Sequence, residues 1–317
     1  MSRKKLKNRR RKDRAQRKIL IAAVCIAAVI IGVGIGGHVI KKNAGKTMTM
    51  AETESKKAVS KKKATAKKLT INENETDASN KENQGQKDQA DDRNEFAVQP
   101  GRKVGATEQS DEKVVYLTLD DGPSKNTQAV LDILDKYNAK ATFFVTGAMP
   151  EYKDMIKKAY DKGHTIGMHT YSHDYAKVYA SVDAYFQDLD QIGQLVKEEI
   201  GYVPCFIRFP GGSSNTISAS YTKGIMTTLT QEVQARGYQY YDWNGSSGDG
   251  AVRTTEQLVD QATSFHDNNI ILLSHDSETK DTTVEALPKI IEYYQSQGYV
   301  FKALDLNSYA AHHGVNN

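Results

Sequence analysis

Short runs of β-branched and aromatic residues alternate with amphipathic helical stretches from about residue 114 to residue 304. This alternation is typical of β-α units around a parallel sheet. The runs with strand character are 114–119, 141–145, 165–168, 205–209, 239–243, 270–273 and 299–304. The stretches with helical period are 127–137, 151–161, 182–200, 218–236, 255–266 and 284–297. Seven strands with intervening helices predict an α/β fold, a distorted seven-stranded (β/α) barrel, with a flat doubly wound sheet as the alternative.

The N-terminal region has a different pattern, with an uncharged run over 19–40 that is long enough to cross a bilayer as a helix. Eleven Lys and Arg residues precede it within residues 1–18. Because a cationic flank before the first span stays in the cytoplasm, we expect a single-pass transmembrane signal anchor at the cell membrane, with everything after Lys41 extracellular.

Two alternatives to this membrane anchor are weaker. A cleaved signal peptide needs a shorter apolar core and a small-residue cleavage site, and no clear site of that kind follows the run. A basic arm for nucleic acid is disfavoured by its position against a span. We therefore expect the membrane, and no nucleic acid, as a partner of this region.

Residues 41–101 are rich in Lys, Glu, Asn, Gln, Asp and Thr and contain almost no aromatic residues. Such a segment has too few apolar groups to offset chain entropy, so we predict a disordered tether. Its first part is cationic and its second part is acidic, which favours a solvated spacer, with binding to an anionic wall polymer as the alternative. Residues 102–317 remain as one folded domain.

Charge is distributed unevenly along the chain. Residues 1–101 carry 24 Lys and Arg against 11 Asp and Glu, whereas residues 102–317 carry 19 against 28, so the basic pI belongs to the N-terminal region. The two cysteines are Cys25, inside the predicted span, and Cys205. Cys205 therefore has no partner for an intrachain disulfide in the outer domain, and that domain must be stabilised by its core.

Polar clusters follow the ends of the predicted strands, which is where barrel enzymes place their active sites. Asp120 and Asp121 come after the first strand and before a Gly-Pro pair that breaks it, so both carboxylates can face one cavity. Two buried carboxylates repel each other unless a cation lies between them. His169 and His173, at i and i+4, would present two imidazoles to one ion if their segment turns helically. With one aspartate they would form a two-histidine, one-carboxylate metal site, and turn-forming aspartates with surface or capping histidines are the alternative.

Three more side chains at strand ends could take part. Arg208, two residues before Pro210, could hold a carboxylate ionised. His275 follows an apolar strand, where a purely structural histidine is the alternative. Trp243 is the chain's only tryptophan, and it would either pack in the core or stack on a sugar ring in a cleft.

Five motifs occur in order: TLDDGPS at 118–124, HTYSH at 169–173, RFPGG at 208–212, YDWN to SSGD at 241–249, and LLSH at 272–275. These motifs resemble those of the polysaccharide deacetylases, the NodB-homology domains of carbohydrate esterase family four. The resemblance covers about residues 114–304 and leaves out the anchor and the tether. It implies a metal-dependent hydrolase that removes acetyl groups from a polysaccharide.

The resemblance also implies the central residues of the reaction. Asp121, His169 and His173 would be the ligands of a divalent metal, Zn²⁺ first, with Co²⁺, Ni²⁺, Fe²⁺ or Mn²⁺ as alternatives. Asp120 would be the general base, which takes a proton from the attacking water. His275 would be the general acid, which protonates the departing amine.

Five further residues would support that reaction if the resemblance holds. Arg208 would orient the base, and Asp249 would pair with the acid, although closing a turn is the alternative role for Asp249. Gly211, Pro210 and Trp243 would bind the substrate. The backbone N–H of Gly211 would face the oxyanion, and Trp243 would contact the sugar.

The chain departs from the family pattern at two positions. The family often has Tyr after the proline of the third motif, where this chain has Gly211, and often ends the fourth motif in Trp, where this chain has Gly250. Both changes remove aromatic walls and indicate a more open groove. The expected substrate is an N-acetylated cell-wall polysaccharide, peptidoglycan first, because an anchor and a tether of about sixty residues would place the domain within reach of it.

Other functions stay open at this point. The polymer could be chitin oligosaccharides, exported poly-N-acetylglucosamine or O-acetylated xylan. The domain could also be an inactive carbohydrate-binding relative, although a binder has no need of the full ligand and acid–base set. A third possible function, a structural tether to the cell wall, is supported by residues 1–101 alone. We expect no obligate protein partner.

Overall fold

In the computed structural model, which describes residues 92–317, the strands lie in one sheet in the order β5-β4-β3-β2-β1-β7-β6, and β8 pairs with β1. All the pairings between these strands are parallel, as β-α alternation requires. The strands are β1 (Val114–Asp120), β2 (Ala141–Thr146), β3 (Thr165–Thr170), β4 (Phe206–Ile207), β5 (Gln239–Tyr240), β6 (Gly245–Ser246), β7 (Asn269–His275) and β8 (Val300–Phe301).

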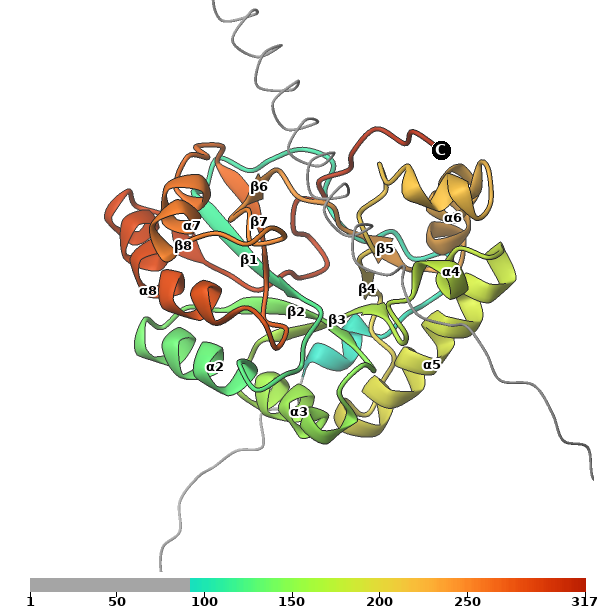
Figure 1. Cartoon of the computed structure of the whole chain (residues 1–317), viewed down its shortest axis with the longest axis horizontal. Helices are drawn as coiled ribbons and strands as arrows, with labels where there is room; N and C mark the ends of the chain where they lie inside the picture. Colours follow the sequence, from blue (N-terminus) through green and yellow to red (C-terminus); the bar gives the residue numbers. More distant parts are fainter. Residues whose placement is uncertain (1–91) are drawn as a thin grey trace, which may run out of the picture. The chain divides into compact units, whose positions relative to one another are not determined.

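The sheet is an open half-barrel. Figure 1 shows the helices ranged around the outside of the strands, which fits the (β/α) barrel rather than the doubly wound alternative with helices on two faces. Within residues 92–317, β5 and β6 stand at the two ends of the strand order and do not pair with each other. The barrel is therefore not closed by hydrogen bonds on that side.

The described residues contain eight strands, one more than the sequence predicts. The additional strand is β6, which has only two residues, Gly and Ser, and pairs with β7 through Gly245 and Ser246. A run this short has no detectable alternation. The expected strand over 239–243 ends at Tyr240, because the carbonyls of Tyr241 and Asp242 accept hydrogen bonds from Arg208 instead of from a neighbouring strand.

Six of the seven α-helices in residues 92–317 agree with the sequence patterns except at their ends, and the four-residue α4 (Tyr175–Val178) was not predicted. Short 3₁₀ helices are η1 (Asp92–Phe96), η2 (Pro150–Tyr152) and η3 (Ile217–Ser220). The α-helices are α2 (Thr127–Lys136), α3 (Asp154–Asp161), α4 (Tyr175–Val178), α5 (Val182–Ile200), α6 (Ile225–Ala235), α7 (Thr255–Ala262) and α8 (Asp281–Ser296). None of these helices of the described region is long and apolar enough to span a membrane, and the predicted span over 19–40 lies outside the described residues.

Strand β1 is the centre of the sheet, and all seven of its residues are buried. Strand β7 pairs with one edge of β1 along its whole length. Strands β8 and β2 share the other edge, β8 at Val114 and Val115 and β2 from Leu117 onwards. Since β1 and β7 end together, Asp120 and His275 are neighbours across the carboxyl end of the sheet.

The folded region begins before residue 102, where the sequence placed the end of the tether. Phe96 is buried and packs edge-on against Phe206, with ring centroids 5.2 Å apart. The Val98 N–H donates to the Val203 carbonyl, and the Cys205 N–H donates to the Phe96 carbonyl, both at 2.8 Å. Hydrophobic periodicity did not reveal this N-terminal arm, residues 92–98, because a single phenylalanine in a polar stretch forms no repeating pattern. Cys205 itself is a buried free thiol, as expected.

Candidate active site

Two carboxylates face the same side at the end of β1, as predicted from the Gly-Pro pair that ends the strand. Asp120 is the last strand residue and is buried, whereas Asp121 has a left-handed backbone with φ 70° and is partly exposed. One carboxylate oxygen of each lies near Nε2 of His169, at 3.9 Å for Asp120 and 3.6 Å for Asp121. The two side chains therefore face the same imidazole.

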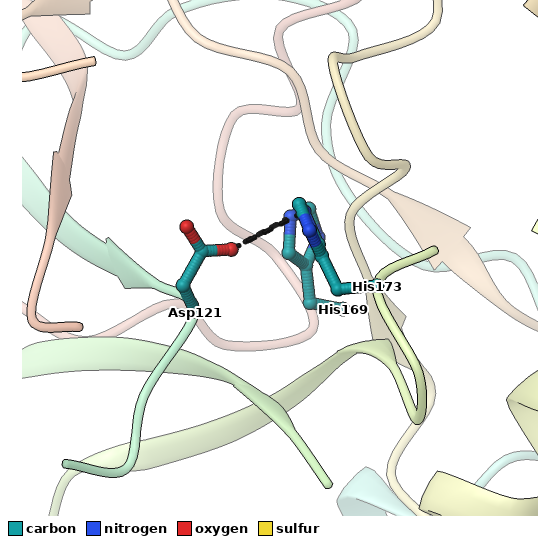
Figure 2. Close-up of side chains that lie close together, drawn as sticks. All are labelled: Asp121, His169 and His173. Carbon is teal, nitrogen blue, oxygen red and sulfur yellow. Dashed lines mark ion pairs between the residues drawn. The ribbon is translucent and has the colours of Figure 1, made fainter. Parts of the chain in front are cut away.

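Asp121, His169 and His173 form a candidate metal centre, and Figure 2 shows both imidazoles beside the carboxylate. One potential ligand atom from each residue lies within 4.8 Å of the others. Asp121 Oδ1 is 3.3 Å from Nε2 of His173. Within the described residues this buried oxygen has no hydrogen-bond partner, which is the condition expected of an atom that binds a cation.

The two histidines reach this position without the helical turn that their spacing suggested. His169 is in β3, and His173 lies in a turn after it with φ 47°. Asp188 of α5 holds that turn, because its carboxylate accepts hydrogen bonds from the backbone N–H groups of Tyr171 and Ser172. Sequence patterns do not single out this aspartate of α5, because its burial depends on tertiary packing.

The state of His169 suits a metal ligand. Its Nδ1 donates to the Arg208 carbonyl at 2.7 Å, which leaves the Nε2 lone pair facing Asp121. Burial, followed by the neighbouring His173, lowers the pKa of His169 to about 3. The imidazole is therefore neutral over the physiological range and can bind a divalent ion through Nε2.

Arg208 and Asp120 form a buried ion pair behind the metal centre. Arg208 is completely buried, and its Nη1 lies 2.8 Å from Asp120 Oδ1. Nη1 also donates to Thr118, and Nε donates to the Tyr241 carbonyl. Burial raises the pKa of Asp120, and the Arg208 charge opposes this without cancelling it. Arg208 was expected to keep this carboxylate ionised, and its charge and hydrogen bond do lower the pKa of Asp120. The pKa nevertheless stays above its usual value because of burial, which makes Asp120 a better proton acceptor.

His275 and Asp249 form the second pair at the carboxyl end of the sheet. His275 Nδ1 lies 2.8 Å from Asp249 Oδ1, and the other carboxylate oxygen accepts from the His275 N–H and from Thr283. Burial alone would lower the pKa of His275, but the charge and hydrogen bond of Asp249 outweigh it and raise the pKa to about 9. Asp249 does more than close a turn.

The third motif continues after β4 as a loop next to Tyr175 and Trp243. The Pro210 carbonyl accepts from the Tyr179 hydroxyl at 2.7 Å, which fixes the loop. Gly211 has φ 77°, and its N–H has no acceptor within residues 92–317. Trp243 is partly buried, and its ring packs against His313 at 4.8 Å between centroids and leaves part of its surface exposed.

Two buried aspartates of this region were given no role by sequence reasoning. Asp242 accepts from the N–H and hydroxyl of Ser213 and from the His313 N–H, so it joins the loop after Gly212 to the C-terminal segment. Asp276 accepts from Thr127, and burial raises its pKa to about 7. Asp242 lies within the fourth motif and Asp276 directly follows the fifth, and these positions were the only signal.

A cavity of about 180 Å³ opens beside the metal centre. Asp121 and His173 line one part of it, and Ser124, Thr146, Ser277 and Glu278 line another. The polar lining and the position against two candidate ligands make it suitable for part of a hydrophilic molecule.

Comparison with known proteins agrees with this geometry. The polysaccharide deacetylase family matches residues 107–229. A peptidoglycan-N-acetylglucosamine deacetylase of Bacillus cereus is 33% identical over 201 residues, which cover 60% of this chain and 69% of that protein. The chain belongs to the polysaccharide deacetylase family.

Two further relatives bear on the fold and on the range of substrates. The catalytic domain of peptidoglycan N-acetylglucosamine deacetylase from Eubacterium rectale is 46% identical with a TM-score of 0.64, over 67% of this chain and 97% of that one. A bifunctional xylanase/deacetylase of Pseudobutyrivibrio xylanivorans is 32% identical over 207 residues, which are 63% of this chain and 31% of that protein.

Proposed function

We propose that this chain is a metal-dependent hydrolase that removes N-acetyl groups from a cell-wall polysaccharide, with peptidoglycan as the substrate. The observation that carries the proposal is the placement of the Asp121, His169 and His173 cluster among two separate acid–base pairs. The relatives described as peptidoglycan N-acetylglucosamine deacetylases support the choice of polymer.

The donor set fits a divalent ion with mixed nitrogen and oxygen ligands, and Zn²⁺ is our first choice. Such an ion would lower the pKa of a water ligand and polarise the acetyl carbonyl. Asp120, held by Arg208, accepts the proton of the attacking water. The Gly211 N–H faces the oxygen on which negative charge develops. His275 then donates its proton to the amine nitrogen as the C–N bond breaks, giving acetate and a free amino sugar.

Two other substrates and one other function compete with this proposal. The similarity to a xylanase/deacetylase makes O-acetylated xylan a candidate, and chitin oligosaccharides remain another. An inactive sugar binder would not need a histidine whose pKa is raised to about 9 by a buried carboxylate beside a metal centre.

Acetate release tests the function directly. The purified chain, loaded with Zn²⁺, is expected to release acetate from peptidoglycan and to leave products lighter by the mass of one acetyl group per site. EDTA should stop the release, and added Zn²⁺ should restore it. Chitin oligomers and acetylated xylan serve as parallel substrates. Release from xylan alone would overturn the choice of polymer, and no release from any of them would overturn the enzyme.

The pH dependence of the reaction should report the pair of His275 and Asp249. Because His275 must be protonated to release the amine, activity should fall above a pH of about 9, where the proton is lost. In Asp249→Asn the burial that lowers the pKa is no longer opposed by a charge, so the alkaline limb should move to lower pH and the acid limb should stay in place. The rate at the optimum should also fall.

The measurement is kcat/KM against pH for the wild type and Asp249→Asn. Thr283→Val is the matched control, since it removes one hydrogen bond to Asp249 and keeps the carboxylate charge. The alkaline limb of Thr283→Val should move less than that of Asp249→Asn. An unmoved limb in Asp249→Asn would remove this residue from the mechanism.

We further propose that residues 1–18 are cytoplasmic, that residues 19–40 anchor the chain in the cell membrane, and that the domain is extracellular. The cationic flank and the uncharged run support this, and both lie outside the described residues. Protease added to intact protoplasts should release a soluble fragment that carries the domain, because lysine-rich spacers are readily cleaved. Protection of the chain until the protoplasts are lysed would reverse the orientation.

A further inference from the structure

Tyr175 lies beside the metal centre without a part in the mechanism described above. It is the first residue of α4, two positions after His173. Its ring packs edge-on against His173 at 6.0 Å and against Tyr179 at 5.4 Å between centroids. Contacts on two sides restrict the ring, so the direction of its hydroxyl is set by the fold.

The Tyr175 hydroxyl reaches the backbone of Gly211. A Cβ atom added to Gly211 would lie only 2.6 Å from the Tyr175 oxygen, well inside contact distance. Two features therefore disfavour a side chain at position 211: this contact and the backbone φ of 77°. The phenol occupies the space into which a side chain at position 211, often Tyr in this family, would begin to extend.

The hydroxyl is free to bond a ligand. Within residues 92–317 it makes no hydrogen bond, whereas the neighbouring Tyr179 hydroxyl donates to the Pro210 carbonyl at 2.7 Å. Both hydroxyls thus face the loop at Pro210 and Gly211, but only that of Tyr179 is hydrogen-bonded to it. A half-buried phenol without a protein partner is a donor available to water or substrate.

We propose that the Tyr175 hydroxyl donates a hydrogen bond to the acetyl oxygen as negative charge develops there, beside the Gly211 N–H. The inference rests on the proposed function, because it takes the oxyanion to form between the metal centre and Gly211. Tyr175 touches both borders of that space: its ring lies against the ligand His173, and its hydroxyl lies over Gly211.

Tyr175→Phe tests the proposal because it removes only the hydroxyl oxygen. We expect kcat to fall by about 100-fold, the scale for loss of one oxyanion donor, with KM little changed. Metal stoichiometry and Tm should stay at the wild-type values. Tyr221→Phe is the matched control, since Tyr221 is 45% exposed and its hydroxyl makes no hydrogen bond within the described region. That variant should keep full activity.

A second readout does not depend on turnover. Acetate, the product, carries its charge on the atoms that Tyr175 should contact, so calorimetric titration of the Zn²⁺-loaded chain should give acetate affinity about tenfold weaker in Tyr175→Phe. Unchanged kcat with unchanged acetate affinity would show that Tyr175 only packs against the site. Loss of metal in the variant would show that it supports His173 instead, which also overturns the proposal.

The two readouts separate this inference from the proposed function. A wild type that binds acetate through Tyr175 but releases none from any polymer would leave Tyr175 as an acetate contact and overturn the function. A wild type that neither binds nor releases acetate would overturn both. Activity in the wild type that Tyr175→Phe retains in full would overturn Tyr175 alone.

Discussion

His173→Ala is expected to abolish stoichiometric metal binding, and acetate release with it, while the domain still folds. His173 is partly exposed in a turn, so the truncation leaves no core cavity. It removes one of three ligand atoms that lie within 4.8 Å of one another, and the remaining Asp121 and His169 would bind a divalent ion much more weakly.

Elemental analysis of the purified variant measures the metal, and thermal melting measures the fold. An ion that binds only the folded state raises Tm, so added Zn²⁺ should raise Tm in the wild type and not in His173→Ala. His266→Ala is the control, because His266 is exposed and lies away from the cluster. Stoichiometric metal in His173→Ala would contradict the ligand set.

His169→Ala should lose the metal too, at a greater cost in stability. His169 is buried in β3, and its Nδ1 donates to the Arg208 carbonyl at 2.7 Å. Truncation therefore leaves a cavity and an unpaired carbonyl as well as an incomplete metal centre. For that reason His173→Ala is the cleaner of the two ligand variants.

Asp120→Asn is expected to keep the metal and to lower kcat by a factor of about 100 or more, the scale of general acid–base catalysis. The amide has nearly the shape of the carboxylate and can still accept the bond from Arg208, but it cannot take a proton from water. Since the Arg208 charge then lacks its buried partner, Tm should fall as well.

Asp121→Asn is the matched comparison, because it makes the same chemical change one residue away. It should lose the metal, since Asp121 Oδ1 is the oxygen closest to both imidazoles. Metal content and kcat are measured for the two variants side by side. Loss of metal in Asp120→Asn with retention in Asp121→Asn would exchange the roles of the two aspartates.

The sequence predicted the long central strands well because they are buried on both faces and consist of continuous apolar runs, as in Val114–Asp120. The polar residues after those strands could be predicted to meet, since parallel strands end at one edge of the sheet. Strand β6 could not be predicted, because pairing with β7 holds Gly245 and Ser246 in place, and neither residue favours a strand.

The local geometry at His173 also escaped prediction. The spacing to His169 suggested one helical turn, but the backbone is a strand followed by a left-handed residue. A bend of that kind is maintained by Asp188, a helix residue fifteen positions further along the chain. Tyr175 was missed for a similar reason, because only the fold brings its hydroxyl over Gly211.

The arm that begins the described chain has a mechanical consequence. It pairs with 203–205 just before β4, at the amino end of the sheet, whereas Asp120 and His275 lie at the carboxyl end. Tension applied at residue 92 would first load the two backbone hydrogen bonds between residues 96–98 and 203–205 and the contact of Phe96 with Phe206. We therefore expect these contacts to break before β1 and β3, which lead into the candidate metal centre, are strained, and the site to keep its geometry when the domain is pulled from this end.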